Sequence, residues 1–542
     1  NAYCKYFLFT NFFMKGGLDL MMTKLSKNER VVVASNVNLR RYLESLLIGR
    51  KATPRSWLYE QISPEEVLSR WKDHLSALEN GSQAEQKVFQ FDTSQEAKWG
   101  PQGEVKPISD LMSIVLEGFG ESPTPKAFAS KNWQSAKNQL VDLLRRSGIS
   151  QLRPASYQHV VDDMRARDVL ESNSGWPMFK RRNIPEVKES SIRDAESGVW
   201  KEYPAIALFR NYNAKTRLVW MFPMAANLVE GSYFQVLYSA FVRNNFTFLS
   251  PWVGFSAVRD LVGQTYNKEQ KFIAASDFSS TDAHFHKAAS LEVYDVLAPL
   301  FQARYRDGLR ESLEHMHTIP LVIGPDRKIV GQHGVSSGSN WTNFVETIFD
   351  WIFSLYVSME ENEIGYSGLY AIGDDMSWVS ARYDDGFAGE LERLGESVGQ
   401  VIKAEKTTNE RDSVKSLQRL FQRGYNNSTG KIRGVYSTIR ALKSSVYPER
   451  FHDPRRWSSD MFCARQFMIL ENCVDHPLFE EFVKFVCKGQ KDLVPFAKLS
   501  KAKLDRIRRE THLLPGLNPT YNQERRGYSF AEFESISIAK TL

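Results

Sequence analysis

The amino-acid sequence predicts an α+β fold in which helices cover an antiparallel sheet. Two short apolar runs, 368–371 and 376–380, flank the turn Ile-Gly-Asp-Asp, a pattern typical of a β-hairpin. The apolar run 271–276 predicts a buried strand, whereas residues 457–487 and 495–510 are typical of helices. A sheet containing a hairpin and separate helical segments is therefore expected.

The tip of the predicted hairpin carries two adjacent acids, Asp374 and Asp375. Two carboxylates this close repel each other and are costly to desolvate unless a positive charge lies between them. A divalent cation is therefore one explanation of the pair. The alternative is an ordinary turn, because Gly-Asp-Asp is also a common turn sequence. The pair alone does not decide between the two.

A second acidic site favours the metal. The strand predicted at 271–276 ends at Asp277, and Asp282 follows about one helical turn later. If this strand lies beside the hairpin, Asp277 and Asp374 converge on one point. Two divalent cations held about 3.5–4 Å apart by such carboxylates are the usual device for in-line phosphoryl transfer. Together, the two acidic sites predict a metal centre of this kind.

A small polar loop between the two acidic sites, beginning at Val335, runs into a predicted helix whose buried face contains Phe344, Ile348 and Ile352. Gly338 lets the loop backbone approach a ligand closely, and the helix N-terminus offers free N–H groups to a phosphate or ribose. The simpler alternative is N-capping of the helix by a serine. The order of these segments along the chain favours a nucleotide site.

Three groups of residues, in this order and at these separations, resemble motifs A, B and C of viral RNA-dependent RNA polymerases. They are Asp277 with Asp282, Ser337 and Gly338 with Thr342, and Gly373 with Asp374 and Asp375. Four further segments resemble motif G (173–177), motif F (Arg210 and 215–223), motif D (405–407) and motif E (420–424). Within the family, the chain looks most like polymerases of the picobirnavirus and partitivirus group of double-stranded RNA viruses, and of picobirnaviruses in particular.

The resemblance implies a catalytic role for several of these residues. Asp277 and Asp374 would be the principal ligands of two Mg²⁺ ions, or of Mn²⁺ in their place, and Asp375 would support them. Lys406 would donate a proton to the leaving pyrophosphate. The chain would then be an RNA-directed RNA polymerase, a nucleotidyltransferase that replicates and transcribes a viral RNA genome.

The resemblance also implies where nucleotide and RNA bind. Asp282 would accept a hydrogen bond from the ribose 2′-hydroxyl and so select ribonucleotides, because a deoxyribose would leave this acceptor unpaired. Cationic side chains would hold the triphosphate, a task suited to guanidinium and ammonium groups. The predicted nucleotide-binding residues are Arg210, Lys215, Arg217, Asp282, Ser337, Gly338 and Thr342, and the predicted RNA-binding residues are Ser174, Gly175, Lys180, Arg181 and Arg423.

One position departs from the family pattern. Many members carry asparagine four residues after the motif B threonine, where it shares the ribose contact, but this chain has Glu346. Asn343 follows Thr342 directly, on another side of the helix. A glutamate beside Asp282 would repel it unless one of the two were protonated or bridged. We therefore predict that Glu346 faces a basic residue or is displaced from the sugar.

The resemblance implies a right-hand polymerase with fingers, an antiparallel-sheet palm and a thumb, closed into a ring by contact between fingertips and thumb. Residues 22–225 would form the N-terminal segment and the fingers, with the first part reaching toward the thumb. Residues 226–440 would form the palm, interrupted by a helical insertion of the fingers at about 286–333, and residues 441–542 the thumb and C-terminal tail. The Phe-rich residues 1–21 are expected to be a leader or an artificial extension outside the fold.

The last segment, from Leu513 onward, loses its periodicity and contains Tyr521 and Tyr528. A polymerase that starts without a primer must hold the first nucleotide in place of a missing duplex, and stacking on an aromatic side chain serves this purpose. We predict primer-independent initiation, with a tyrosine of this tail as a candidate platform. The alternative is a terminus that is disordered or packs on the thumb.

The composition agrees with an enzyme that binds RNA only through local patches of positive charge. An apolar content of 42% in 542 residues is ample for a large core, and a net charge of +6 provides no overall field for nucleic acid. The positive charge must therefore be concentrated in patches, such as 180–182 beside motif G. Four cysteines indicate a reducing compartment rather than a disulfide framework, and no apolar stretch is long enough to span a bilayer.

The expected partners are template and product RNA, ribonucleoside triphosphates and a viral capsid protein. We expect a monomer that binds no membrane, located in the virion interior and the host cytoplasm. Two other functional classes are alternatives. A reverse transcriptase bars the 2′-hydroxyl with a bulky side chain near motif A and uses a Tyr-x-Asp-Asp hairpin, so Asp282 and Gly373 argue against it. A non-catalytic RNA-binding or capsid-associated protein is disfavoured by the intact Asp277, Asp374 and Lys406.

Overall fold

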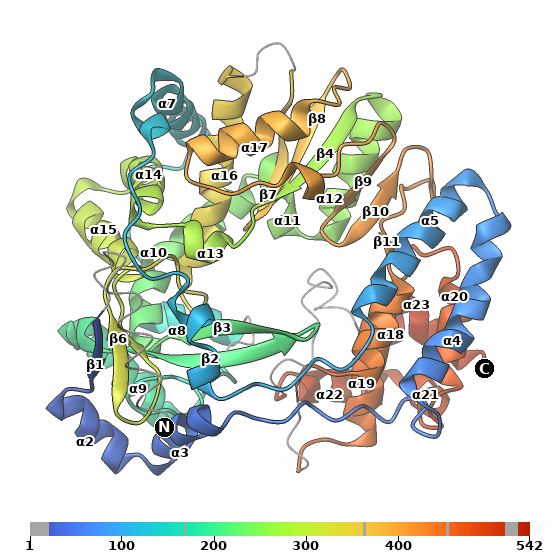
Figure 1. The fold of residues 1–542 in the computed structure, drawn as a ribbon, viewed down its shortest axis with the longest axis horizontal. Coiled ribbons are helices and arrows are strands. Elements are labelled where there is room, and N and C mark those ends of the chain that lie inside the picture. The colour runs from blue at the N-terminus through green and yellow to red at the C-terminus, as the bar shows by residue number, and fades with distance from the viewer. Residues whose placement is uncertain (1–20, 167–169, 361–364, 451–454, 515–528) are drawn as a thin grey trace.

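The computed structural model describes residues 21–166, 170–360, 365–450, 455–514 and 529–542. Within these residues, helices and sheets are arranged in a ring (Figure 1), and three large hydrophobic cores and one smaller core hold them together. The predicted mixture of helices and antiparallel sheets is confirmed.

A three-stranded antiparallel sheet lies against the largest core. Its strand order is β4 (Phe272–Asp277), β8 (Asp375–Ser380), β7 (Ser367–Ile372), so the predicted hairpin and the predicted strand at 271–276 are both confirmed as neighbours. The sheet forms because its apolar side chains, such as Ala274 and Trp378, are fully buried under the helices. The helices around it are α7 (Lys131–Arg146), α11 (Ser250–Val253), α12 (Phe255–Gly263), α13 (Thr281–His284), α14 (Lys287–Leu297), α15 (Arg306–His315), α16 (Trp341–Glu360) and α17 (Phe387–Ser397).

A five-stranded sheet forms a second body, with strand order β1–β6–β5–β2–β3. Its longest part is the hairpin of β2 and β3, and β2 pairs in parallel with β5. Its strands are β1 (Met21–Lys24), β2 (Ala205–Tyr212), β3 (Lys215–Met221), β5 (Leu321–Val322) and β6 (Arg327–Val330), and the helices beside it are α2 (Lys27–Ser35), α3 (Val37–Ile48), α6 (Met112–Leu116), α8 (Tyr157–Ala166), α9 (Pro185–Ser197) and α10 (Met224–Arg243).

This sheet corrects two predicted boundaries. The insertion predicted to be helical at about 286–333 ends in strands, because the buried side chains of Leu321, Val322 and Ile329 complete the sheet. Met21 pairs with Val330, so the boundary predicted after residue 21 falls inside β1. Residues 1–20 lie outside the described part of the chain.

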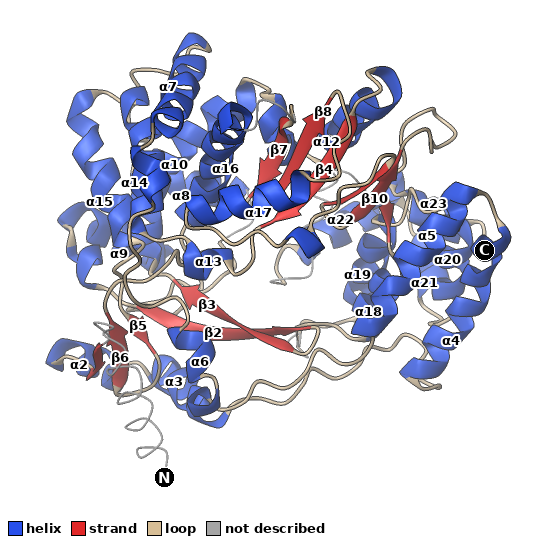
Figure 2. Cartoon of the chain, turned by 45° about the horizontal axis from the view of Figure 1, so that its top comes forward, coloured by secondary structure: helices blue, strands red, loops and turns tan. Residues whose placement is uncertain are grey.

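The third body brings together two segments that are far apart in the sequence. Apolar side chains between Leu58 and Phe91 share one core with side chains between Leu420 and Ala539 (Figure 2). The first part of the chain therefore packs with the last part, as predicted. The elements are β9 (Ser413–Ser416), β10 (Arg419–Gln422) and β11 (Val435–Tyr436), with helices α4 (Pro64–Leu75), α5 (Gln83–Thr93), α18 (Thr438–Val446), α19 (Ser459–Glu471), α20 (Phe479–Cys487), α21 (Leu493–Ala497), α22 (Lys501–Thr511) and α23 (Glu534–Lys540).

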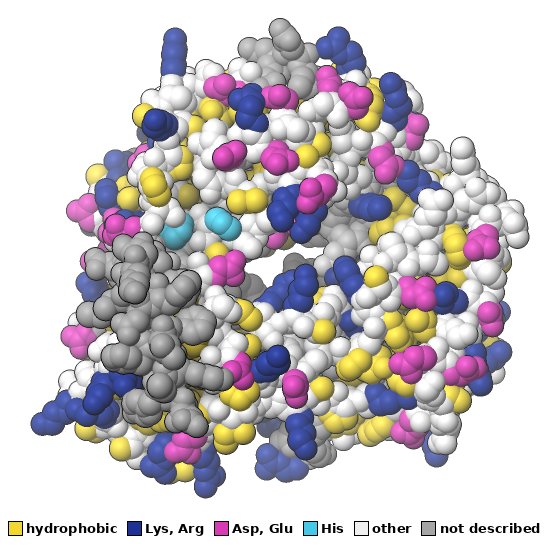
Figure 3. Space-filling model, in the orientation of Figure 1, with side chains coloured by type: hydrophobic (Ala, Val, Ile, Leu, Met, Phe, Trp, Pro, Cys, Tyr) yellow, Lys and Arg dark blue, Asp and Glu magenta, His cyan; other side chains and the backbone are white. Residues whose placement is uncertain are grey.

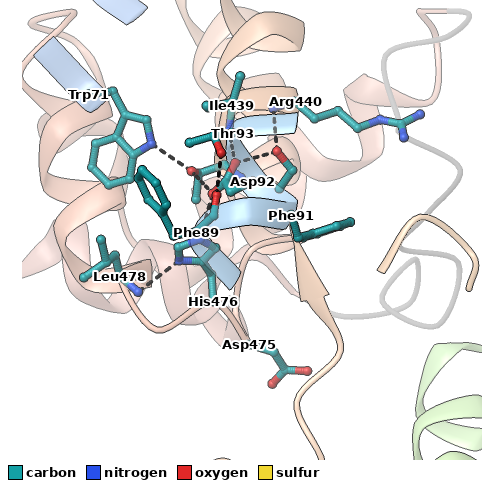
Figure 4. Close-up of polar contacts among 12 residues, drawn as sticks. Trp71, Phe89, Phe91, Asp92, Thr93, Ile439, Arg440, Asp475, His476 and Leu478 are labelled. Carbon is teal, nitrogen blue, oxygen red and sulfur yellow. Dashed lines mark hydrogen bonds and ion pairs between the residues drawn. The ribbon is translucent and has the colours of Figure 1, made fainter. Parts of the chain in front are cut away.

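A buried polar network centred on Asp92 ties these two segments together (Figure 4). Asp92 is completely buried and lies near the end of α5. It accepts hydrogen bonds from the hydroxyls of Ser437 and Thr438, both at 2.6 Å, and from the backbone N–H of Ile439 at 3.0 Å. Nε2 of His476 lies 2.8 Å from one of its carboxylate oxygens. Asp92 thus satisfies the free N–H groups at the start of α18 from outside that helix.

The bodies also meet across the central opening. The chain between α3 and α4 and the chain between α5 and α6 run side by side from one body to the other (Figures 1 and 2). The turn of the β2–β3 hairpin reaches the third body, where Lys443 donates to Asn213 and Arg440 donates to the Tyr212 hydroxyl at 3.2 Å. Figure 3 shows the opening from one side, with Lys and Arg side chains gathered at its edge.

Three cysteines, Cys463, Cys473 and Cys487, are buried free thiols. None of the helices in the described ranges has both the length and the apolar character needed to cross a bilayer. The tail tyrosines Tyr521 and Tyr528, which were predicted as candidate stacking platforms, lie outside the described residues.

Candidate active site

Three carboxylates meet at one end of the β4–β8–β7 sheet. Asp277 ends β4 and is paired with Asp375 at the start of β8, while Asp374 occupies the turn between β7 and β8. One carboxylate oxygen from each residue lies within 4.8 Å of the other two. The predicted convergence of Asp277 and Asp374 is therefore confirmed. Gly373 permits the turn because its φ of +58° lies in the left-handed region.

The three acids are crowded by like charge. Burial and the neighbouring Asp374 and Asp375 raise the pKa of Asp277 to about 8, and burial and Asp374 raise the pKa of Asp375 to about 7. Burial also raises the pKa of Asp374. A divalent cation offsets the repulsion between carboxylates that lie this close, because such hard cations bind several oxygen ligands at one point. The residues present therefore fit a divalent metal.

Two cations act on this cluster. Lys406 is exposed in the short turn Ala404–Lys406, and its charge lowers the pKa of Asp277. Arg217 is exposed on β3, and its charge lowers the pKa of both Asp374 and Asp282. Both residues therefore act on the acidic cluster, and the roles that the resemblance implies for them, toward pyrophosphate and triphosphate, stay predictions. Lys215 is exposed next to the turn of the β2–β3 hairpin, and Arg210 pairs with Glu449 at 2.7 Å.

Burial and the charge of Asp282 raise the pKa of Glu346 well above its usual range. The prediction was that Glu346 faces a basic residue or is displaced from the sugar. The charges that act on Glu346 are those of acids, Asp282, Asp374 and Asp350, so the first alternative is not supported, and the second stays a prediction. Glu346 is only 5% exposed on α16, and its Oε1 has no hydrogen-bond partner among the described residues. Asn343 is exposed on the same helix, and a Cβ placed on Gly373 would lie 2.9 Å from its Nδ2. The amide nearest the acidic turn is therefore that of Asn343.

The loop before α16 is held by β3. The Ser337 hydroxyl accepts the backbone N–H of Trp220 at 3.0 Å, and the buried Thr342 hydroxyl donates to the Ser336 carbonyl at 2.5 Å. A Cβ on Gly338 would lie 1.8 Å from the Trp220 carbonyl oxygen. Glycine at this position therefore allows close approach of β3, whereas the sequence had suggested close approach of a ligand. The nucleotide contacts predicted for Ser337, Gly338 and Thr342 stay predictions.

A buried residue that the sequence analysis missed supports this loop. Glu230 on α10 accepts the Asn340 backbone N–H at 3.0 Å and the Asn227 amide at 2.9 Å, and the Ser339 hydroxyl also donates to it. Burial raises the pKa of Glu230 to about 7. The available signal was a pair of polar residues, Asn227 and Glu230, three positions apart in the mostly apolar first half of α10.

The basic patch predicted at 180–182 is smaller than expected. Arg182 is turned inward, where it donates to the Asn173 carbonyl at 3.1 Å and to Asn227 at 2.8 Å. Burial lowers its pKa to about 10. Lys180 and Arg181 remain partly exposed, although Arg181 approaches Glu171 at 3.4 Å. Arg182 is therefore a structural residue, and only its two neighbours stay candidates for RNA contact.

Ser174 and Gly175 shape the loop that presents these cations. Ser174 is 3% exposed, its N–H donates to the Lys180 carbonyl at 2.7 Å, and its hydroxyl accepts the Lys180 N–H at 3.2 Å. Gly175 has a φ of +67°, and a Cβ there would lie 2.6 Å from the Phe222 carbonyl oxygen. Both residues therefore fix the backbone, and the direct RNA contact predicted for them stays untested.

Arg423 requires a correction. It was predicted to bind RNA, but its guanidinium donates to Asp412 at 2.8 Å, to the Tyr266 carbonyl at 2.6 Å and to the Lys271 carbonyl at 2.8 Å. It also lies over the rings of Tyr266 and Phe272. These contacts occupy all three of its nitrogens and brace the loop after β10 against the start of β4.

Comparison with known proteins shows which family the site resembles. Residues 212–420, which contain the three acids, Arg217 and Lys406, match the family described as viral RNA-dependent RNA polymerase. The chain is 26% identical over 478 residues to a potential RNA-dependent RNA polymerase of human picobirnavirus (strain Human/Thailand/Hy005102/-), covering 84% of this chain and 86% of that protein. A shorter match, 26% over 166 residues, covers 30% of this chain and 31% of an RNA-directed RNA polymerase of Cryptosporidium parvum virus 1 (strain KSU-1).

Solved structures agree on the fold. The crystal structure of a human picobirnavirus RNA-dependent RNA polymerase superposes with a TM-score of 0.74 at 23% identity, covering 90% of this chain and 93% of that one. An insertion-loop deletion mutant of such a polymerase gives a TM-score of 0.76 at 23% identity, with 96% and 99% covered. The likeness therefore extends over almost the whole chain.

Proposed function

Since the chain belongs to the viral RNA-dependent RNA polymerases and catalyses RNA-templated RNA synthesis, we propose that nucleotidyl transfer occurs at the cluster of Asp277, Asp374 and Asp375. The observation that carries this assignment is the meeting of three carboxylates at the ends of two paired strands, within 4.8 Å of one another. An arrangement of this kind has no structural benefit without a cation, because the like charges repel.

Two Mg²⁺ ions are the proposed cofactor, with Mn²⁺ as a substitute. Asp277 and Asp374 would hold them and Asp375 would assist. The bound ions would activate the attacking hydroxyl and stabilise the leaving pyrophosphate. Arg217, whose charge acts on the neighbouring acids, is the proposed ligand of the triphosphate, and Lys406 is the proposed proton donor to pyrophosphate.

In the terms of a right-hand polymerase, the β4–β8–β7 sheet with α16 corresponds to the palm, the β2–β3 hairpin to the fingertips and the core around α18 to the thumb. The contacts of Asn213 with Lys443 and of Tyr212 with Arg440 support a closed ring of fingertips and thumb. The basic edge of the central opening supports a path for RNA and nucleotides through that ring (Figure 3).

The wider setting follows from the family. We propose replication and transcription of a viral RNA genome, primer-independent initiation, a monomeric enzyme, a capsid protein as partner, and a location in the virion interior and host cytoplasm. Synthesis on a single-stranded template without primer tests the initiation step directly, because a primer-dependent enzyme yields product only after a primer is added.

The central experiment measures incorporation of ribonucleotides and deoxyribonucleotides on an RNA template with Mg²⁺, comparing the wild type with Asp374→Ala. Loss of the substituted carboxylate should lower incorporation at least about 100-fold. Asp73→Ala is the matched control, because Asp73 is exposed on α4. Activity that survives Asp374→Ala would overturn the metal assignment.

A further inference from the structure

Two loops with different predicted roles are joined by a series of hydrogen bonds. The 173–182 loop contains residues predicted to bind RNA, and Arg182 closes this loop by donating to the Asn173 carbonyl at 3.1 Å. The 336–340 loop contains residues predicted to bind the nucleotide. Helix α10 contacts both loops through Asn227 and Glu230, which are 2% and 1% exposed. The connection therefore runs through the buried face of α10.

The side-chain amide of Asn227 is the centre of this connection. Its Oδ1 accepts from the Arg182 guanidinium at 2.8 Å. Its Nδ2 donates to Glu230 at 2.9 Å and to the Gly338 carbonyl at 3.1 Å. A guanidinium has only donors, and a backbone carbonyl only accepts. Arg182 therefore fixes which end of the amide faces Glu230 and Gly338, because a rotated amide would set donor against donor and acceptor against acceptor.

Glu230 holds the 336–340 loop largely by its backbone. Its Oε1 accepts the Asn340 backbone N–H at 3.0 Å, and its Oε2 accepts the Ser339 hydroxyl. Strand β3 holds the preceding positions of the same loop, where Ser337 accepts a backbone N–H at 3.0 Å and Gly338 lies against the strand. The backbone of the loop is therefore fixed at successive residues by α10 and β3, so a change at either element displaces it.

We propose that Arg182, Asn227 and Glu230 act in series as positioning residues that set the 336–340 loop for nucleotide binding. Arg182 then serves nucleotide binding, although its neighbours Lys180 and Arg181 are the residues predicted to bind RNA. This inference rests on the proposed nucleotide site, because the position of the loop affects the reaction only if the loop contacts the incoming nucleotide.

A positioning role and a purely structural role predict different kinetics during elongation of a primed RNA template at saturating RNA. Glu230→Ala removes an acceptor from Asn340 and Ser339, so the KM for the ribonucleotide should rise by about 10-fold while kcat stays within about three-fold. Glu230→Gln should keep KM within about three-fold, because its carbonyl oxygen accepts the N–H groups of Asn227 and Asn340 and its amide donates to the Ser339 oxygen. A purely structural role would lower the folded fraction and leave KM unchanged.

Arg182 tests whether the three residues act in series. Arg182→Met keeps the apolar stem but removes the donors, so it should raise the same KM by about three- to ten-fold. Adding Glu230→Ala should raise KM little further, because both changes interrupt one connection. Arg193→Gln and Glu189→Gln, at exposed positions of α9, are the matched controls and should keep the wild-type KM.

Three kinetic results would overturn the proposal. The first is an unchanged KM in Glu230→Ala. The second is a double variant in which the two effects multiply in full, because the residues would then act independently. The third is weaker RNA affinity of Arg182→Met at fixed salt with an unchanged nucleotide KM, which would assign Arg182 to RNA. Thermal unfolding of each variant checks folding, and the less buried Arg182→Met carries the test if Glu230→Ala does not fold.

Hydrogen–deuterium exchange tests the connection without catalysis. The backbone N–H groups of residues 339–341 are hydrogen-bonded, so they should exchange slowly in the wild type and in Glu230→Gln. They should exchange faster in Glu230→Ala and in Arg182→Met. Exchange that is equal in the wild type and in both of these variants would overturn the proposal even if the enzyme were active. A wild type that incorporates no nucleotide would instead refute the proposed function, whatever the exchange shows.

Discussion

Asp277 lies directly opposite Asp375 in the antiparallel pairing of β4 with β8. This register places one acid from each strand at the same edge of the sheet, and the turn adds Asp374 beside them. A shift of the register by one residue would turn one of the two side chains to the other face of the sheet. The geometry of the acidic cluster therefore depends on the pairing that the buried strands enforce.

The first prediction concerns metal binding and stability. Adding Mg²⁺ or Mn²⁺ should raise the free energy of unfolding of the wild type, by about 2.7 kcal/mol at a cation concentration one hundred times Kd. Asp374→Ala should remove most of this gain, because one of the three ligands is missing. The measurement is the Tm with and without cation. Asp73→Ala, on an exposed helix face, should behave as the wild type, and an undiminished shift in Asp374→Ala would mean that the cation binds elsewhere.

The second prediction tests whether Arg423 stabilises the fold or binds RNA. Arg423→Gln should lower the free energy of unfolding by about 2 kcal/mol, because hydrogen bonds to the Tyr266 and Lys271 carbonyls are lost. RNA affinity at fixed salt should stay within about two-fold, because no phosphate contact is removed. Urea unfolding and fluorescence anisotropy with labelled RNA measure the two effects. Lys415→Gln, an exposed residue of β9, is the control; weaker RNA binding by Arg423→Gln with normal stability would restore the original assignment.

Much of the β4–β8–β7 sheet could be predicted from the sequence, because the residue patterns that specify it are local. The hairpin is specified by a turn with glycine between apolar runs, and Asp277 directly follows such a run. The surroundings of Glu346 were not predictable from local pattern. Whether the charge of a cation or of Asp282 acts on position 346 depends on the tertiary structure, and a burial pattern does not report which polar group is near.

The sequence did not predict the structural roles of Arg182, Glu230 and Arg423, for a related reason. Each is a charged residue, and charged residues are mostly exposed, so composition favours solvent or RNA as their partner. Here backbone carbonyls and buried amides occupy them. Long-range contacts of this kind depend on tertiary structure, as does the contact of Asp92 with segments more than 340 residues later.

The third prediction concerns the network in Figure 4. Burial raises the pKa of Asp92, but the hydrogen bond and the charge of His476 lower it, as do the hydrogen bonds from the hydroxyls of Ser437 and Thr438. The net effect is a lowered pKa, so Asp92 is a buried anion. Asp92→Ala should lower the free energy of unfolding by about 3–5 kcal/mol, because its hydrogen-bond donors are left buried without an acceptor. Urea unfolding measures this loss.

The matched control is Glu96→Ala in the segment that follows α5. Glu96 forms a partly exposed ion pair with Lys72 at 2.8 Å, and ion pairs near the surface contribute about 1 kcal/mol or less. If Asp92→Ala were no less stable than Glu96→Ala, the network would not be what joins α5 to α18.

The fourth prediction concerns acid stability and His317. This residue is completely buried; its Nδ1 donates to the His333 carbonyl at 3.0 Å and its Nε2 accepts from the Ser290 hydroxyl at 2.7 Å. Burial lowers its pKa from 6.5 to about 3. Below pH 6.5 the unfolded chain therefore binds a proton that the folded chain does not, so the contribution of His317 is present above this pH and is lost as the pH falls toward 3. The slope is about 1.4 kcal/mol per pH unit.

The informative variant is His317→Gln, because it removes the group that titrates, whereas a change at Ser290 would disturb only the hydrogen bond. The free energy of unfolding of the wild type and of His317→Gln should be measured with urea at several pH values between about 8 and about 5. The difference between the two proteins should be constant above about pH 7.5. Below about pH 6.5 it should shift steadily against the wild type, as the contribution of neutral His317 is lost.

His333 and His286 lie near His317 in both proteins, so their own titration largely cancels in the difference. His159→Gln, on an exposed face of α8, is the control and should follow the wild type at every pH. A difference between wild type and His317→Gln that does not vary with pH would mean that folded and unfolded His317 take up the proton alike. The hydrogen bond with Ser290 would then have to reverse its direction in the folded protein, because a protonated Nε2 can only donate.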